Sequence, residues 1–256
     1  MHILITNDDG VTHPGLLALA KALSKLGKVT VFAPVRNWSA SGHVKTLHKP
    51  LRVWDTTLKD GTPALTTDGA PSDCVALALL GLIQDPIDIV VSGINPLANV
   101  GHDVTYSGTV TAAMEAAIFG LPGIATSIDS DREHGVDIAF DTAAEITSNL
   151  VHGFTNQHLT SGVFLNINIP NKLQAAIKGV RITRQGDRIY RDELVEREDP
   201  RGRKYYWIGG DAPTGVPEPG TDIGALSEGF VSITPLGLDL TAKDMIQKLE
   251  TWNLQI

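Results

Sequence analysis

The chain has 256 residues and a mass of 27.3 kDa; 42% of its residues are hydrophobic and 20% are charged. These proportions are ordinary for a globular protein and exclude disorder throughout the chain. The net charge of −8 repels phosphate backbones, so duplex nucleic acid is not expected as a partner.

The sequence also indicates a compartment. The chain opens on an apolar run without a basic leader, and no apolar stretch reaches the ~18 residues of a transmembrane helix. Cys74 is the only cysteine, so no intrachain disulfide can form. We therefore expect a cytoplasmic protein without a membrane partner.

Strand and helix patterns alternate from the N-terminus to Pro170. Short apolar runs predict buried strands, and amphipathic or Ala-rich segments that open on Pro or Gly predict helices. This alternation is typical of parallel βαβ units with right-handed crossovers. The expected strands are 2–6, 28–33, 88–92, 124–128 and 163–169, and the expected helices are 14–26, 71–80, 108–119 and 137–152.

Beyond Pro170 the helical periodicity disappears until a final helix, which Thr241 is expected to cap and which runs to about Leu249. We predict an α/β fold with two parts. A Rossmann-like three-layer core with a mostly parallel sheet comprises residues 1–179 and 229–256 and carries the active site. A β-rich excursion over residues 180–228 forms an extended C-terminal hairpin arm for oligomerisation. Its short strand patterns are 180–184, 188–194 and 203–208, and a strand at 230–234 returns to the core.

The strongest motif, Asn7-Asp8-Asp9-Gly10, directly follows the first predicted strand. In an open parallel sheet, ligands bind beyond the carboxyl ends of the strands, near the point where the strand order reverses. Two adjacent carboxylates repel each other there, and a divalent cation with oxygen ligands stabilises them. The alternative is a capped turn, because Asp and Asn are also favoured in turns.

Two further segments can bring oxygen ligands to the same edge. Asn95 follows the strand at 88–92, and a doubly wound sheet order places it opposite Asp8 and Asp9. Asn37 and Ser39 lie in a long polar loop after the strand at 28–33. The alternatives are an Asx turn at Asn95 and a solvated surface loop at 36–43, although loops of this length are often functional.

The segment 99–110 combines polar and small residues before an Ala-rich helix. Free N–H groups at a helix start favour an anion, and hydroxyl groups there can donate to phosphate oxygens. The alternative is simple N-capping by Ser107. The residues that we assign to phosphate or substrate binding are Asn37, Asn99, Ser107, Gly108 and Thr109.

Together these motifs resemble the SurE family, stationary-phase survival proteins that act as metal-dependent 5′-nucleotidases. The resemblance implies metal ligands at Asp8, Asp9, Ser39 and Asn95, and a homodimer or homotetramer. Ala40 and Leu97 depart from the family pattern, which has glycine at both positions, but neither change removes a ligand. The resemblance rests on ILITNDDG at 3–10, AP and the loop at 33–43, GAPSDCVALAL at 69–79, DIVVSGIN at 88–95, NVGHDVTYSGTVTAAMEA at 99–116, DPRGRKYYW at 199–207, GTD at 220–222 and GFVSITPLGLDLT at 229–241.

We therefore expect a phosphomonoesterase that hydrolyses nucleoside 5′-monophosphates to nucleoside and phosphate, with one Mg²⁺ or Mn²⁺ per subunit. Asp8 and Asp9 are the predicted catalytic residues. A metal-bound water is the preferred nucleophile, and direct attack by one of these two carboxylates, giving an aspartyl-phosphate, is the alternative. Two other functions stay open: a nucleotide-sensing protein without turnover, and a nucleotide-sugar transferase, which also suits paired aspartates and a metal.

Overall fold

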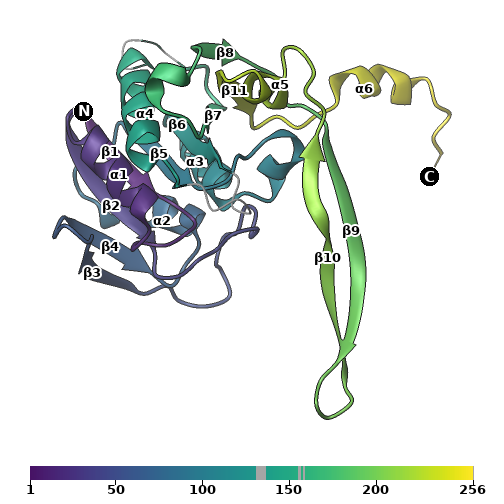
Figure 1. The fold of residues 1–256 in the computed structure, drawn as a ribbon, viewed down its shortest axis with the longest axis horizontal. Coiled ribbons are helices and arrows are strands. Elements are labelled where there is room, and N and C mark those ends of the chain that lie inside the picture. Colours follow the sequence, from purple (N-terminus) through teal and green to yellow (C-terminus); the bar gives the residue numbers. More distant parts are fainter. Residues whose placement is uncertain (131–136, 155–156, 158, 256) are drawn as a thin grey trace.

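The computed structural model describes residues 1–130, 137–154, 157 and 159–255. Its centre is a nine-stranded sheet with the order β3-β4-β2-β1-β5-β6-β7-β11-β8 (Figure 1). Only the pairs β3–β4 and β7–β11 are antiparallel among the described strands of this sheet, so the predicted mostly parallel sheet is confirmed. The strands are β1 (His2–Thr6), β2 (Lys28–Pro34), β3 (Val53–Thr57), β4 (Pro63–Thr67), β5 (Ile89–Asn95), β6 (Gly123–Asp129), β7 (Val163–Pro170), β8 (Val180–Ile182) and β11 (Val231–Gly237).

Helices cover both faces of the sheet and make the predicted three layers. Side chains alternate along β1, so Ile3 and Ile5 enter the core beneath α1 and α4, and Leu4 enters the core beneath α2 and α3. All three side chains are fully buried, which anchors the central strand from both faces. The α-helices are α1 (Pro14–Leu23), α2 (Pro71–Leu77), α3 (Gly108–Ile118), α4 (Phe140–Phe154), α5 (Asp222–Ser227) and α6 (Lys243–Glu250). The shorter helical turns are η1 (Ala78–Leu82), η2 (Gly101–Thr105) and η4 (Gln174–Ala176).

The hairpin of β9 (Arg188–Glu198) and β10 (Lys204–Gly215) extends away from the body as a two-stranded arm (Figure 1). Both strands are longer than the sequence pattern predicted. The projecting arm is also shorter than the predicted excursion 180–228, because β8 joins the central sheet beside β11 and α5 packs against β11. Asp222, at the start of α5, is completely buried.

Some predicted boundaries were wrong. The edge strand β3 and its neighbour β4 were not predicted, and β3 is mostly exposed and has no apolar alternation. The helix from Pro71 becomes a π-helical turn after Leu77 and ends near Gly81, whose φ of +112° breaks the helix. The N-cap of α6 is Ala242, not Thr241, whose N–H donates a hydrogen bond to the Asp239 carboxylate.

In the described part of the chain, no helix combines the length and hydropathy needed to cross a membrane.

Candidate functional site

The candidate site lies where the order of the sheet reverses. The chain runs outward from β1 to β2 on one side and returns through β5 on the other side. The carboxyl ends of β1 and β5 therefore meet at the switch point, where parallel sheets bind ligands. Asp8 and Asp9 follow β1, and Asn95 ends β5. The predicted doubly wound arrangement thus brings these three residues to one edge.

Asp8 is the most enclosed of these groups, with 3% of its surface exposed. The N-terminus of α3 packs directly on it: a Cβ on Gly108 would lie 2.8 Å from Cβ of Asp8, so only glycine fits there. The Thr109 hydroxyl donates a hydrogen bond to Oδ1 of Asp8. Burial raises the pKa of Asp8 to about 6, and the charge of Asp9 adds to the rise, while the hydrogen bonds from Thr109 oppose it.

Asp9 is held by the polar loop that follows β2. The Asn37 amide donates to Oδ1 of Asp9 at 3.3 Å, and its own Oδ1 accepts the Ser39 N–H at 2.7 Å. The Trp38 N–H donates to the Asp8 carbonyl at 2.7 Å. These bonds fix the loop against the two aspartates, so that Ser39 lies beside them.

A cavity of about 980 Å³ opens in front of these groups. Its walls bring together much of the predicted set, and four predicted residues, Asp9, Asn37, Gly108 and Thr109, are not among those that line it. One wall comes from the β1 and β5 ends, a second from the loop at 39–40, and a third from the base of the arm. The predicted site residues that line it are Asp8, Ser39, Asn95, Asn99 and Ser107, and other lining residues include Asp103, Tyr106, Arg188 and Pro213.

Several predicted phosphate contacts have structural partners. Ser107 accepts the Val110 N–H and caps α3. The Asn99 amide donates to Ser127, and the Thr109 hydroxyl is taken by Asp8. Asn99 and Ser107 keep their place in the cavity wall, but Thr109 is fully buried. We therefore assign Thr109 to holding the Asp8 carboxylate, in place of the predicted phosphate contact.

Sequence reasoning missed residues that hold the site loops. Glu115 on α3 has 2% of its side chain exposed and binds His43 at 2.7 Å and Lys45 at 3.1 Å, which ties down the polar loop. Asn166 and Asn168 on β7 both donate to the Asn99 carbonyl. No local motif marks these residues, because their partners lie tens of residues away in the chain. Only the pairing of distant segments shows their role.

The donors at the switch point suit a hard divalent cation. Two carboxylates, a hydroxyl and a carboxamide are all oxygen ligands, the set that Mg²⁺ and Mn²⁺ take in proteins. The Nδ2 group of Asn95 donates to the Leu97 carbonyl, so the Oδ1 atom is the ligand that this side chain can offer. Among the described residues no lysine or arginine pairs with Asp8, and a cation would supply the missing positive charge.

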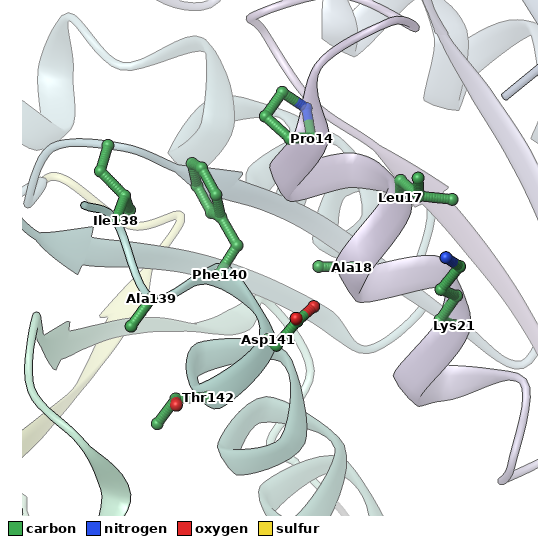
Figure 2. A pocket seen from close by; sticks show the side chains of 9 residues that line it. All are labelled: Pro14, Leu17, Ala18, Lys21, Ile138, Ala139, Phe140, Asp141 and Thr142. Atoms are coloured by element: carbon green, nitrogen blue, oxygen red, sulfur yellow. The ribbon is translucent and has the colours of Figure 1, made fainter. Parts of the chain in front are cut away.

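A second hollow of about 460 Å³ lies between α1 and the start of α4 (Figure 2). Apolar side chains such as Leu17 and Phe140 line it, and its charged lining residues are Lys21 and Asp141. The described residues that line this hollow include no cluster of oxygen ligands comparable to that at the switch point. We therefore place the candidate site in the larger cavity.

Known proteins resemble this chain over nearly its full length. The family model described as "Survival protein SurE" matches residues 3–192. A protein named "5′-nucleotidase SurE" from Herpetosiphon aurantiacus is 52% identical, with 99% of each chain covered. A protein of the same name from Chloroflexus aggregans is 50% identical, covering 98% of this chain and 99% of its own. The crystal structure of "Sure Protein" from Aquifex aeolicus superposes with a TM-score of 0.81 at 38% identity and covers 98% of both chains.

Proposed function

This chain belongs to the SurE family, and from that premise we propose that it is a metal-dependent 5′-nucleotidase. It is a phosphomonoesterase that converts nucleoside 5′-monophosphates to nucleoside and phosphate. The observation that carries the proposal is the meeting of Asp8, Ser39 and Asn95 in one cavity, with Asp9 beside them and the start of α3 against Asp8. The identity and coverage of its named relatives support the same activity.

The cavity is divided between a cation side and a phosphate side. Asp8, Asp9, Ser39 and Asn95 are the proposed ligands of one divalent cation per subunit. A cation bound there would neutralise charge on the phosphate and polarise the phosphorus atom. Thr109 and Asn37 hold the two carboxylates in place through hydrogen bonds.

The phosphate itself is proposed to lie at the N-terminal end of α3. Amide groups and the helix dipole favour negative charge there, and they stabilise charge that develops on the transferred phosphoryl group. Ser107 caps this end and lines the cavity, and Gly108 follows it as the first residue of α3. Residues 39–40 of the loop after β2 and residues 97–100 of the loop after β5 line other sides of the cavity.

We propose Mn²⁺ or Mg²⁺ as the metal, because a set made only of oxygen ligands favours these ions over Zn²⁺. The substrate is a small anionic ester that enters an acidic protein, so the cation also serves to attract it. We further propose that the protein acts in the cytoplasm as a homodimer or homotetramer, in which the arm of β9 and β10 contacts another subunit.

Phosphate release from a panel of nucleoside monophosphates tests the proposed function. The protein is treated exhaustively with EDTA and assayed before and after addition of Mn²⁺ or Mg²⁺. We expect no turnover in the metal-free protein and restored turnover with the added ion. Full activity in verified metal-free protein contradicts the metal requirement. Nucleotide binding without phosphate release supports the sensing alternative, and turnover of a nucleotide sugar alone supports a transferase.

A further inference from the structure

The Gly-Thr-Asp motif at 220–222 places a buried carboxylate outside the proposed catalytic set. Asp222 starts α5, and none of its surface is exposed. Its Oδ2 accepts the Gly101 N–H at 2.8 Å, and its Oδ1 accepts the N–H groups of Gly186 and Ile223, each at 2.8 Å. One side chain thus joins three separate stretches of backbone.

These three stretches are the parts that build one wall of the cavity. Gly101 begins the turn η2, which carries Asp103. Gly186 lies just before Arg188, the first residue of the arm. Ile223 lines the cavity from α5, as Asp103 and Arg188 do from their own segments. The Asp222 carboxylate therefore fixes the position of the turn η2 relative to the base of the arm.

The backbones approach so closely at this joint that side chains are excluded. Gly101 has a φ of +53°, and a Cβ built on it would lie 2.5 Å from the Gly186 carbonyl oxygen. The Gln185 amide donates to the Gly101 carbonyl at 2.8 Å, which adds a second bond across the same joint. Several hydrogen bonds and two glycines meet at this contact between residue 101 and residues 185–186, which we call the joint. The joint therefore fixes the position of η2 relative to the base of the arm.

Polar and aromatic groups face the cavity beyond this joint. Asp103 pairs with Nε of Arg188 at 2.8 Å and accepts the Tyr190 hydroxyl at 2.6 Å. The Tyr106 ring meets the Tyr190 ring edge to face, with centroids 6.5 Å apart. The charge of the Arg188 guanidinium is already paired with Asp103, and the Tyr106 ring offers an aromatic surface. Such a wall is suited to the sugar and base of a nucleotide.

We propose that Asp222 is a positioning residue for nucleotide binding, because it locks the turn at Gly101 to the base of the arm and so shapes the wall that receives the nucleoside. The proposal rests on the proposed nucleotidase function. Asp222 touches neither the metal ligands nor the phosphate end of α3, so its effect depends on the nucleoside part of the substrate.

The test compares Asp222→Asn with the parent protein in the presence of Mn²⁺. The carboxamide keeps the shape but turns one acceptor into a donor that faces a backbone N–H. We expect KM for adenosine 5′-monophosphate to rise roughly tenfold or more, the scale of a lost hydrogen bond to a charged group. KM and kcat for p-nitrophenyl phosphate, which lacks a nucleoside, and the Kd for Mn²⁺ from calorimetry should stay within about twofold.

Asp60→Asn is the matched control, because Asp60 also accepts a backbone N–H, from Thr62, but in the turn between β3 and β4. It should leave all four measurements unchanged. Gln185→Met is the second variant, for use if Asp222→Asn does not fold, and should raise KM for the nucleotide in the same selective way.

Two results overturn the proposal. An unchanged KM for the nucleotide in both joint variants means that the joint is not needed for binding. An equal loss with p-nitrophenyl phosphate, or a loss of Mn²⁺ affinity, means that Asp222 only supports the fold. Failure of the nucleotidase assignment itself is distinct, because the parent protein then releases no phosphate from nucleotides.

Discussion

The hydroxyl of Thr109, at the start of α3, donates a hydrogen bond to Oδ1 of Asp8, at the end of β1. Both residues are buried, and 101 positions of the chain separate them. The bond joins the helix that is proposed to hold the phosphate to a carboxylate that is proposed to hold the metal. A substitution at the start of this helix should therefore change the affinity of the protein for the metal.

Replacing Thr109 with Val is expected to weaken metal binding. The change keeps the shape of the side chain but removes a donor to a buried charge, which costs ~1.5–3 kcal/mol. We expect the Kd for Mn²⁺ to rise about tenfold, with kcat/KM falling at limiting metal and recovering in part with excess Mn²⁺. Thr147→Val is the control, since it also removes a buried hydroxyl, in α4. Unchanged Mn²⁺ affinity with reduced phosphate binding would contradict this role and support the phosphate contact that the sequence predicted for Thr109.

The raised pKa of Asp8 predicts that metal binding depends on pH. A cation competes with the proton for this carboxylate, so Mn²⁺ affinity should fall about tenfold for each pH unit below the pKa of about 6. Calorimetric titrations at pH 5, 6 and 7 measure this slope. An affinity that is flat over this range would contradict a shared site for proton and cation.

The same shift predicts how the metal-free protein unfolds. Folding raises the pKa of Asp8 from 3.8 to about 6, so the folded state binds the proton more tightly than the unfolded state. The stability gained in this way is complete below the unfolded pKa and is lost as the pH rises through about 6. In EDTA, the free energy of unfolding should fall by about 1 kcal/mol from pH 5 to pH 7 relative to Asp8→Asn, as measured with urea. An identical pH dependence in the two proteins would contradict the raised pKa.

The switch point was predictable from the sequence because its signals are local. Each proposed ligand ends or follows an apolar strand, and strands of that type form parallel sheets with their ends together, as seen for Asp8 and Asn95. The partners of a side chain are not local. The sequence places the Thr109 hydroxyl at a helix start. From the sequence alone, a contact with phosphate cannot be distinguished there from a hydrogen bond to Asp8. Asp222 lies far along the chain from Gly101, and only the folded backbone brings them together.

Ala40 is expected to carry backbone strain in the loop that presents Ser39. It has a φ of +57°, a left-handed conformation that costs a residue with a Cβ about 1–2 kcal/mol. Ala40→Gly should therefore raise the free energy of unfolding by up to ~1 kcal/mol, after the larger entropy of unfolded glycine is subtracted. Urea unfolding measures the change. Ala18→Gly in α1 should instead destabilise, and a loss of stability at position 40 as well would contradict the strain.

Glu115 is expected to control the loop that presents Ser39. Burial favours a neutral carboxyl group, but the hydrogen bonds and charges of His43 and Lys45 outweigh it and lower the pKa of Glu115. Its contribution to stability is therefore present at neutral pH and lost as the pH falls through the lowered pKa. Glu115→Gln should cost about 1–2 kcal/mol at pH 7 and weaken Mn²⁺ binding severalfold, because the loop is released. Glu145→Gln, which breaks the exposed pair with Lys25, should change neither quantity.

The arm carries apolar side chains that the single chain leaves in solvent. Leu194 and Ile208 face each other across β9 and β10, and they are 74% and 85% exposed, while the neighbouring Trp207 is 63% exposed. A two-stranded hairpin is marginal alone in water, so we expect these side chains to pack on another subunit.

Light scattering at micromolar concentration should therefore show a dimer or tetramer, and the double change Leu194→Lys with Ile208→Lys should shift the protein toward a 27.3 kDa monomer. Asp192→Lys adds a lysine to the same hairpin without removing an apolar side chain, and it should leave the assembly intact. If the parent protein is itself a 27.3 kDa species, the arm does not serve for oligomerisation. If the double variant assembles as the parent does, the contact between subunits lies elsewhere on the molecule.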